Sequence, residues 1–118
     1  MTYEVTTPIL GEKNISKVTL SELDDLMSIL KTDTNNTITL INPFILTDYD
    51  IKLPKEVYNL LDISDNSSLS VYVLIDMKDS PQESIVDLQK AFIFNNDNKK
   101  MAQIDIENEK QYKLGELL

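Results

Sequence analysis

Carboxylates are the only side chains in this sequence that are abundant enough to suggest acid–base chemistry. Several occur as close pairs: Asp24/Asp25, Asp48/Asp50, Asp62/Asp65 and Asp76/Asp79. A glycosidase-type hydrolase needs two carboxylates facing each other across a cleft, one with a raised pKa so that it can donate a proton. Sequence spacing does not place two carboxylates across a cleft, and exposed, solvated carboxylates are the simpler interpretation in a chain this acidic. A carboxylate-dependent hydrolase is therefore only an alternative, and we expect no enzyme activity.

Other catalytic and metal-binding groups are missing from the composition. The chain has no histidine and no cysteine, which excludes Ser-His-Asp and Cys-His nucleophilic sites and every zinc site built on thiolates. The segment from Asp62 to Asn66 resembles the start of a calcium loop but lacks its glycine and closing glutamate. Gly11 and Gly115 stand too far apart to form a phosphate-binding loop. We expect no metal and no cofactor.

The charge balance narrows the class of partner. Eleven basic residues oppose 20 acidic ones, so the net charge is −9, and every basic residue is a lysine. Proteins bind phosphate and guanine mainly through arginine side chains and positive electrostatic potential. Direct nucleic-acid binding is therefore disfavoured, and an OB-like nucleic-acid-binding protein is a weak alternative. An anionic membrane surface is disfavoured for the same reason. A basic protein partner is favoured, since complementary charge speeds encounter and fixes orientation.

Length and hydropathy favour a single domain in the cytoplasm. The first residues, Met1 to Val5, carry neither the basic region nor the apolar core of a signal peptide. The longest wholly apolar run, Val71 to Ile75, is far shorter than the roughly 20 residues of a membrane span. A chain of 118 residues can bury one core without a disulfide or a metal. We expect one domain over residues 1–118, cytoplasmic, not membrane-bound, and monomeric when free.

Short β-branched segments dominate the chain and are typical of strands. Strands are expected over residues 2–9, 15–20, 37–41, 69–78 and 101–106. Strand segments over 85–88 and 91–95 are either separate or one strand bent or bulged near Gln89 and Lys90. Asn42-Pro43 ends the strand 37–41, because proline cannot donate to the ladder. An extended segment is expected over 44–52, a helix opening at Leu53-Pro54, and a loosely held tail from Glu107.

Residues 21–31 are ambiguous by periodicity alone. Ser21 and Asp24 resemble a capping box, and Leu23, Leu26, Met27 and Leu30 recur at helical spacing. The same residues are compatible with a buried strand. With either outcome, seven or eight short strands predict a mainly β fold: a small antiparallel β-barrel-like domain with one or two short helices.

The irregular segment after Pro43 is the best candidate for partner contact, because loops beside rigid strands expose polar and aromatic groups together. The residues that we select for partner binding are Asn42, Phe44, Asp48, Tyr49 and Asp50. The alternative is that Asn42, Pro43 and Tyr49 only shape the connection, with Tyr49 half-buried and pinning the loop by its hydroxyl.

Two blocks in this part of the chain carry a family pattern. Leu40 to Pro54 contains a strand ending in Asn-Pro, then Asp-Tyr-Asp-Ile, then Leu-Pro before a helix. Asp87 to Asn95 reads Asp-Leu-Gln-Lys-Ala-Phe-Ile-Phe-Asn, and a turn separates it from Gln103-Ile104. In order and spacing these blocks resemble the FliW family of flagellar assembly factors, in which Asn-Leu-x-Ala-Pro-x-x-x-Asn stands in the second block. The resemblance covers roughly residues 37 to 106.

The chain also departs from the family pattern. Asp87, Lys90 and Ala91 stand where the family has Asn, Ala and Pro, and residues 18–25 lack the family's Phe-Pro-x-Gly-x-Pro-Gly-Phe-Glu loop. Partner contacts made by that loop are therefore not carried over. The resemblance favours a turn over 21–25 followed by a strand over 26–31.

The resemblance implies a compact β-barrel and a regulatory role without catalysis. FliW proteins bind flagellin in the cytoplasm and antagonise the RNA-binding translational repressor CsrA by protein–protein binding. The two partners compete, which couples flagellin synthesis to export. The alternative from a different class is an acidic interaction adaptor of another system, and a pull-down from native lysate would separate the two.

Overall fold

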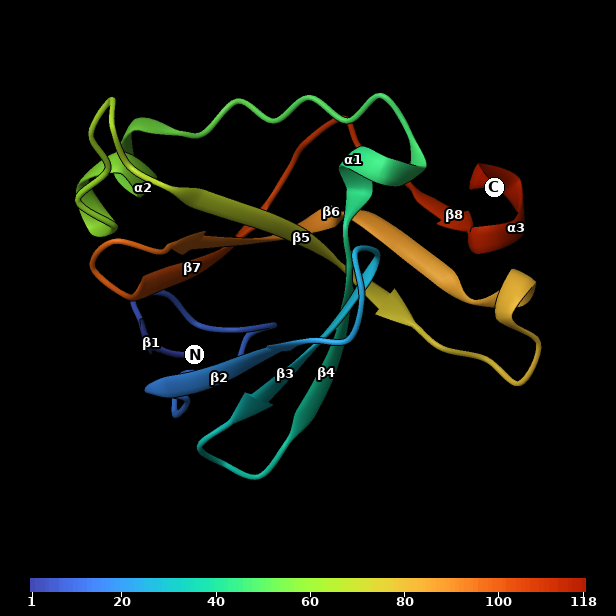
Figure 1. Ribbon diagram of the computed structural model, residues 1–118, viewed down its shortest axis with the longest axis horizontal. Coiled ribbons are helices and arrows are strands. Elements are labelled where there is room, and N and C mark those ends of the chain that lie inside the picture. The colour runs from blue at the N-terminus through green and yellow to red at the C-terminus, as the bar shows by residue number, and fades with distance from the viewer.

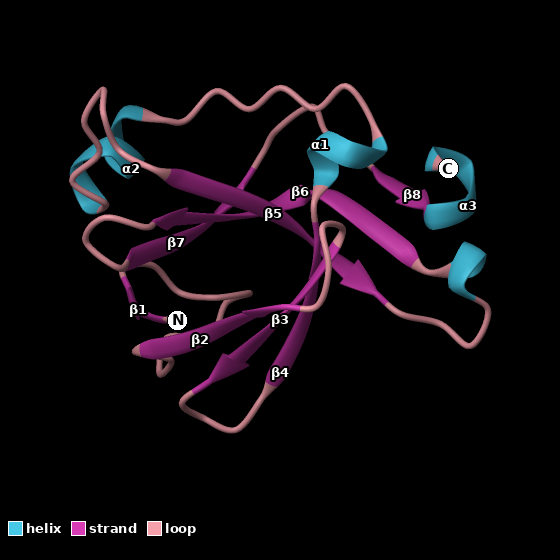
Figure 2. Cartoon of the chain, in the orientation of Figure 1, coloured by secondary structure: helices cyan, strands magenta, loops and turns pink.

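The computed structural model describes residues 1–118 and is mainly β (Figures 1 and 2). The strands are β1 (Thr2–Val5), β2 (Lys17–Glu22), β3 (Met27–Thr32), β4 (Thr37–Ile41), β5 (Leu69–Asp76), β6 (Ile85–Asn95), β7 (Lys100–Asp105) and β8 (Gln111–Lys113). The short helices are α1 (Pro43–Leu46), α2 (Lys55–Leu60) and α3 (Leu114–Leu117), with a 3-10 turn at Pro81–Glu83. No helix is long and apolar enough to span a membrane.

Seven strands close into a barrel. Hydrogen bonding follows the order β5-β4-β3-β2-β1-β7-β6, and a further β5–β6 ladder completes the ring, while β8 adds to the free side of β6. All ladders are antiparallel except β1–β7, which is parallel. The expected small β-barrel is confirmed, with three short α-helices rather than one or two.

The barrel interior is filled by every second side chain of its strands, as the pleat requires. The interior core consists of Tyr3, Ile9, Ile15, Val18, Leu20, Leu30, Leu40, Tyr72, Phe92, Phe94 and Met101. Phe94 lies at its centre, with Tyr3 at 4.9 Å and Tyr72 at 5.9 Å between ring centroids, both edge to face. This geometry is the favourable one for aromatic pairs.

The outer face of β5, β6 and β7 is covered by the long connection between β4 and β5. Figure 1 shows this connection running from α1 to α2 along one side of the barrel. Val57 and Leu61 of α2 pack on Ala91, Ile93 and Ala102 of the sheet. Because β6 is therefore buried on both faces, its apolar residues do not alternate with polar ones.

Residues 23–26 form a turn and residues 27–32 a strand, whereas Ser21 and Glu22, which were expected in the turn, still belong to β2. The carboxylate of Asp24 accepts the backbone N–H groups of Leu26 and Met27 at 2.8 and 2.7 Å, which closes a turn instead of capping a helix. In β3 the alternate residues Ser28, Leu30 and Thr32 are buried. The preference for a strand here is confirmed.

Of the two alternatives for residues 85–95, the single bent strand is confirmed as β6. The β5–β6 register shifts between Val73 and Leu74, whose partners are Ala91 and Asp87. The three residues between those partners form a bulge, and the Asp87 carboxylate accepts the backbone N–H of Gln89 at 3.0 Å inside it. The bulge lets one long strand pair with β7 at one end and β8 at the other.

Three other expectations were wrong. The first strand ends at Val5: the Thr6 backbone N–H still donates to the Met101 carbonyl, but at Thr7 the side-chain hydroxyl replaces the backbone and bonds both the N–H and the carbonyl of Gln103. The segment 44–52 is not wholly extended, since α1 occupies Pro43–Leu46. The tail is not loose: β8 pairs with β6, and Leu114 is buried.

Candidate protein-binding site

Helix α1 presents two apolar side chains to solvent directly after a sharp turn. Asn42 caps the helix by accepting the Phe44 N–H at 3.0 Å, and Pro43 supplies a first helical position that needs no donor. Phe44 and Ile45 are 50% and 57% exposed. Two neighbouring apolar residues this exposed on a single turn are typical of a contact surface.

Tyr49 holds this turn in place from beneath. Its side chain is only 7% exposed, its hydroxyl donates to the Leu88 carbonyl at 3.1 Å, and its ring meets Phe44 edge to face at 5.6 Å between centroids. Burial, with a smaller contribution from the nearby Glu109 carboxylate, raises the pKa of Tyr49 to about 12. Tyr49 therefore pins the segment to the bulge of β6 and supports Phe44 from behind.

The turn between β2 and β3 lies against the start of α1. Asn42 donates its backbone N–H to the Leu26 carbonyl at 2.7 Å, and its side-chain amide reaches the Asp25 carbonyl at 3.5 Å. Leu23 on this turn is 62% exposed. The backbone N–H groups of Met27 and Leu26 lower the pKa of Asp24, so its carboxylate is ionised at neutral pH.

These two elements form what we name the α1 surface: Leu23, Asp24, Asp25, Asn42, Phe44, Ile45 and Asp48. Exposed apolar side chains are flanked here by exposed carboxylates. The arrangement is suited to a partner segment that carries apolar residues with basic neighbours.

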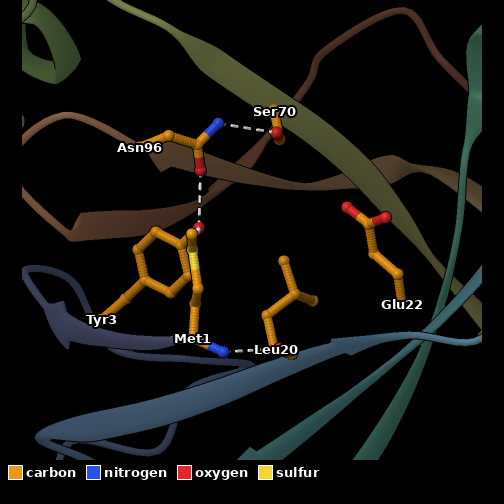
Figure 3. A pocket seen from close by; sticks show the side chains of 6 residues that line it. All are labelled: Met1, Tyr3, Leu20, Glu22, Ser70 and Asn96. Atoms are coloured by element: carbon orange, nitrogen blue, oxygen red, sulfur yellow. Dashed lines mark hydrogen bonds between the residues drawn. The ribbon is translucent and has the colours of Figure 1, made fainter.

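Two hollows meet at Ser70 of β5, and one of them lies beside the α1 surface. One, of about 220 Å³, is lined by Asn42, Phe44 and the β5 residues Leu69 to Tyr72. The other, of about 480 Å³, is drawn in Figure 3 and is lined by Met1, Tyr3, Leu20, Glu22, Ser70 and Asn96. Figure 3 shows the Glu22 carboxylate pointing from β2 toward β5, across from Ser70. Ser70 borders both hollows.

A third hollow, of about 410 Å³, gathers acidic groups from the other end of the connection. Its carboxylates are Asp50, Asp105, Glu107 and Glu109, beside Lys52. A hydrogen bond from Lys90, with a smaller one from Gln103, lowers the pKa of Asp105. A general acid needs the opposite shift. No group of three or more potential ligands is placed to hold a metal ion.

The selected residues do not all share one place. Asn42, Phe44 and Tyr49 come together at α1, with Asp48 exposed next to them, whereas Asp50 lines the acidic hollow. Sequence reasoning missed Ile45 and Leu23. The helix-capping signature Asn42-Pro43 could have identified α1, and with it the exposure of Ile45.

Comparison with known proteins places this fold in a family. The model of the family described as FliW protein matches residues 1–117. "Flagellar assembly factor FliW" of Sulfurimonas denitrificans is 32% identical over 118 residues, covering 98% of this chain and 94% of that protein. "Flagellar assembly factor FliW 2" of Wolinella succinogenes is 34% identical over 92% of this chain and 81% of its own length.

A solved structure supports the same architecture. "Crystal structure of the flagellar assembly factor FliW" superposes with a TM-score of 0.84 at 21% identity, covering 96% of this chain and 84% of that chain. The structural match shows that the two proteins share the barrel fold. The sequence matches show the family to which the chain is related. With the family model spanning nearly the entire chain, the protein belongs to the FliW family.

Proposed function

We propose that this protein is a cytoplasmic, single-domain flagellar assembly factor that binds flagellin and antagonises the translational repressor CsrA. In this scheme flagellin and CsrA compete for the protein. Free flagellin occupies the protein and leaves CsrA active as a repressor, whereas export of flagellin releases the protein to antagonise CsrA, and flagellin synthesis resumes. The observation that carries the proposal is membership of the FliW family across residues 1–117, together with relatives described as flagellar assembly factors.

The α1 surface is the contact that we assign to this function. Phe44 and Ile45 offer apolar area that is already rigid, because the Asn42 cap and the Tyr49 ring fix the turn before any partner arrives. Preorganised aromatic side chains lose little conformational entropy on binding, which favours affinity. The flanking carboxylates add charge complementarity to a basic partner.

Charge supports the proposed antagonism of CsrA. An RNA-binding protein needs positive potential, and a partner with a net charge of −9 is attracted to it. Once docked, this protein adds negative potential near the RNA path without occupying the RNA groove. Because RNA affinity depends steeply on the number of neutralised phosphates, such docking weakens RNA binding.

A salt series tests this electrostatic step. CsrA–RNA affinity is measured with and without the protein from about 50 to 300 mM salt, a range in which the screening length shortens markedly. We expect the antagonism to weaken as salt rises, at concentrations where CsrA remains bound to the protein. Antagonism that does not change with salt would remove the electrostatic part of the proposal.

The central experiment is titration of the protein with flagellin and CsrA of its own organism, separately and together, by calorimetry. We expect each to bind alone and each to displace the other. Binding of neither would favour an adaptor of another system. Binding of both at once without displacement would overturn the competition.

Substitution at α1 tests the assigned surface. Phe44→Ser should weaken flagellin or CsrA binding about tenfold or more, as truncation of a central aromatic contact does. It should lower the melting temperature by only a few degrees, because the edge contact with Tyr49 that is lost is worth about 0.5–1.5 kcal/mol. Tyr58→Ser is a matched control, because Tyr58 is a similarly exposed aromatic residue, at 45%, on the distant helix α2. Equal losses from both variants would refute the assignment.

Asp48→Ala separates charge from shape on the same surface. Asp48 is exposed, so the substitution should lower the association rate more than it raises the dissociation rate. Wild-type association kinetics with both partners would remove Asp48 from the contact.

A further inference from the structure

Strand β5 pairs with β4 over only two residues, so part of this side of the strand is left unpaired although the barrel closes. On one side, β6 pairs with every residue from Leu69 to Val73. On the other side, β4 pairs only with Val73 and Leu74. The chain after Ile41 would have continued along β5, but Pro43 has no N–H to donate and turns the backbone into α1. Residues 69–72 therefore have no neighbouring strand on that side.

The register shows which backbone groups this edge presents. Asn96 donates its N–H to the Ser68 carbonyl at 2.8 Å. Hydrogen-bonded and non-bonded pairs alternate along an antiparallel ladder, so the backbone groups of Ser70 and Tyr72 point to β6. Those of Leu69 and Val71 point away from β6, and outside the strand ladders no hydrogen bond of the protein uses them. An edge of this kind is a template for an added strand.

Hollows border both faces of this edge. The hollow of about 220 Å³ is lined by the edge itself and by Phe44. The hollow of about 480 Å³ reaches this edge at Ser70, which lines it together with Tyr3 and Asn96 (Figure 3). Side chains of an added strand alternate between its two faces. One set would thus enter the larger hollow, and the other would lie against Phe44.

The larger hollow contains one carboxylate without an opposite charge. Glu22 accepts the Tyr72 hydroxyl at 3.4 Å and takes part in none of the four ion pairs of the protein. The positive groups nearby are engaged with carbonyls, since the N-terminal ammonium donates to Leu20 and the Lys99 ammonium to Asn96. A lysine or arginine side chain entering from an added strand would complete the site.

We propose that an extended segment of a basic protein partner adds to the edge of β5 at residues 69–72, in the place that β4 leaves at Pro43. The segment bonds the backbone of Leu69 and Val71 and directs a basic side chain to Glu22. A second copy of this chain is the less suitable occupant, because it would bring two Glu22 carboxylates and two net charges of −9 together. This inference rests on the edge itself and not on flagellin or CsrA.

Selection from random decapeptides displayed on phage tests the proposal without naming a natural partner. We expect the selected peptides to alternate β-branched residues with lysine or arginine. As synthetic peptides, they should slow amide hydrogen exchange at Leu69 and Val71 by about tenfold or more. N-methylation of every second residue should abolish binding for one of the two alternate sets and leave it largely intact for the other, since only alternate N–H groups of an added strand face β5.

Two substitutions locate the contact. Val71→Pro removes an N–H that faces away from β6, and should weaken peptide binding about fivefold or more. Val71→Ala keeps that N–H and should weaken binding less than about threefold, while amide exchange at Phe92 checks that the β5–β6 ladder is intact in both variants. Glu22→Gln should weaken the basic peptides about two- to fivefold, and Glu12→Gln, at an exposed turn, should not.

Each other outcome overturns the proposal. Failure to select any peptide, or selected peptides that leave exchange at Leu69 and Val71 unchanged, would exclude strand addition here. Exchange at these amides that slows as the concentration of free protein rises would assign the edge to a second copy. Because neither flagellin nor CsrA enters the test, failure of the proposed function would leave its result intact.

Discussion

The hydroxyl of Tyr49 provides a sharp test of how the α1 surface is held. Tyr49→Phe keeps the ring, and with it the contact to Phe44, and removes only the hydrogen bond to the Leu88 carbonyl. That carbonyl then loses its buried donor, which costs about 1–3 kcal/mol. With an unfolding entropy of about 2.1 cal/mol/K per residue over 118 residues, the melting temperature should fall by about 4–12 °C.

The pKa of Tyr49 adds a pH dependence with a defined sign. Tyrosine ionises near pH 10.0 in the unfolded chain and near 12 in the folded protein, because burial opposes the phenolate. The stability associated with the neutral phenol is complete below about pH 10 and is lost as pH rises toward 12. A shift of about two units corresponds to about 2–3 kcal/mol, which the phenylalanine variant does not lose.

The assay is urea unfolding of both proteins, followed by circular dichroism at pH 7, 10 and 11.5. The wild type should be the more stable at pH 7, and the gap should narrow between pH 10 and 11.5. Comparison with the variant cancels the contributions of Tyr3 and Tyr72, whose pKa values burial also raises. A gap below about 0.3 kcal/mol at pH 7, or one that stays constant with pH, would refute the assigned role of the hydroxyl.

Three further predictions concern side chains that hold turns. Asn42→Ala removes the cap of α1 and should cost about 1 kcal/mol in urea unfolding; an unchanged midpoint would mean that Pro43 alone sets the turn. Asn95→Ala removes the buried bond to the Leu61 carbonyl and should cost about 1–3 kcal/mol, unless Asn98, which bonds the same carbonyl, compensates fully. A hydrogen bond from the Ser16 hydroxyl lowers the pKa of Asp33 below its ordinary 3.8. The ionised Asp33 carboxylate therefore stabilises the folded protein above pH 3.8, and this stabilisation is lost as pH falls through the pKa that Asp33 has in the folded state. Asp33→Asn should therefore flatten the acid side of the stability profile, and an unchanged profile would contradict this.

Several features of the fold follow from local sequence. The β-branched segment 37–41, the Asn42-Pro43 stop and the bend near Gln89 all appear in the structure as the residues indicate. These features depend on pleat alternation, on the missing donor of proline and on side-chain bonds within a few residues. The helix α1 was missed although its cap is a local signal, because the exposed apolar residues that follow gave it no amphipathic pattern.

The net charge and the absence of certain residue types are likewise known from the sequence alone. A net charge of −9 and the absence of histidine, cysteine and arginine narrow the chemistry before any fold is known. The face of the molecule that carries the binding groups is not readable in this way. Tyr49 and Asp50 are adjacent in sequence, yet one is buried beneath α1 and the other lines the acidic hollow.

Tertiary structure alone decided how the barrel closes and what it leaves open. The parallel β1–β7 ladder joins Glu4 to Lys100, and β8 returns to the start of β6, so the tail is fixed by pairing and not by its own composition. Pairing between segments that are distant in sequence leaves no hydrophobic periodicity by which it could be predicted. Its stability comes from the strand ladder and the core, which form only when the barrel closes. The unpaired edge at residues 69–72 also results from tertiary structure. The chain turns away from β5 into α1 at Pro43, and no other strand pairs with this side of residues 69–72.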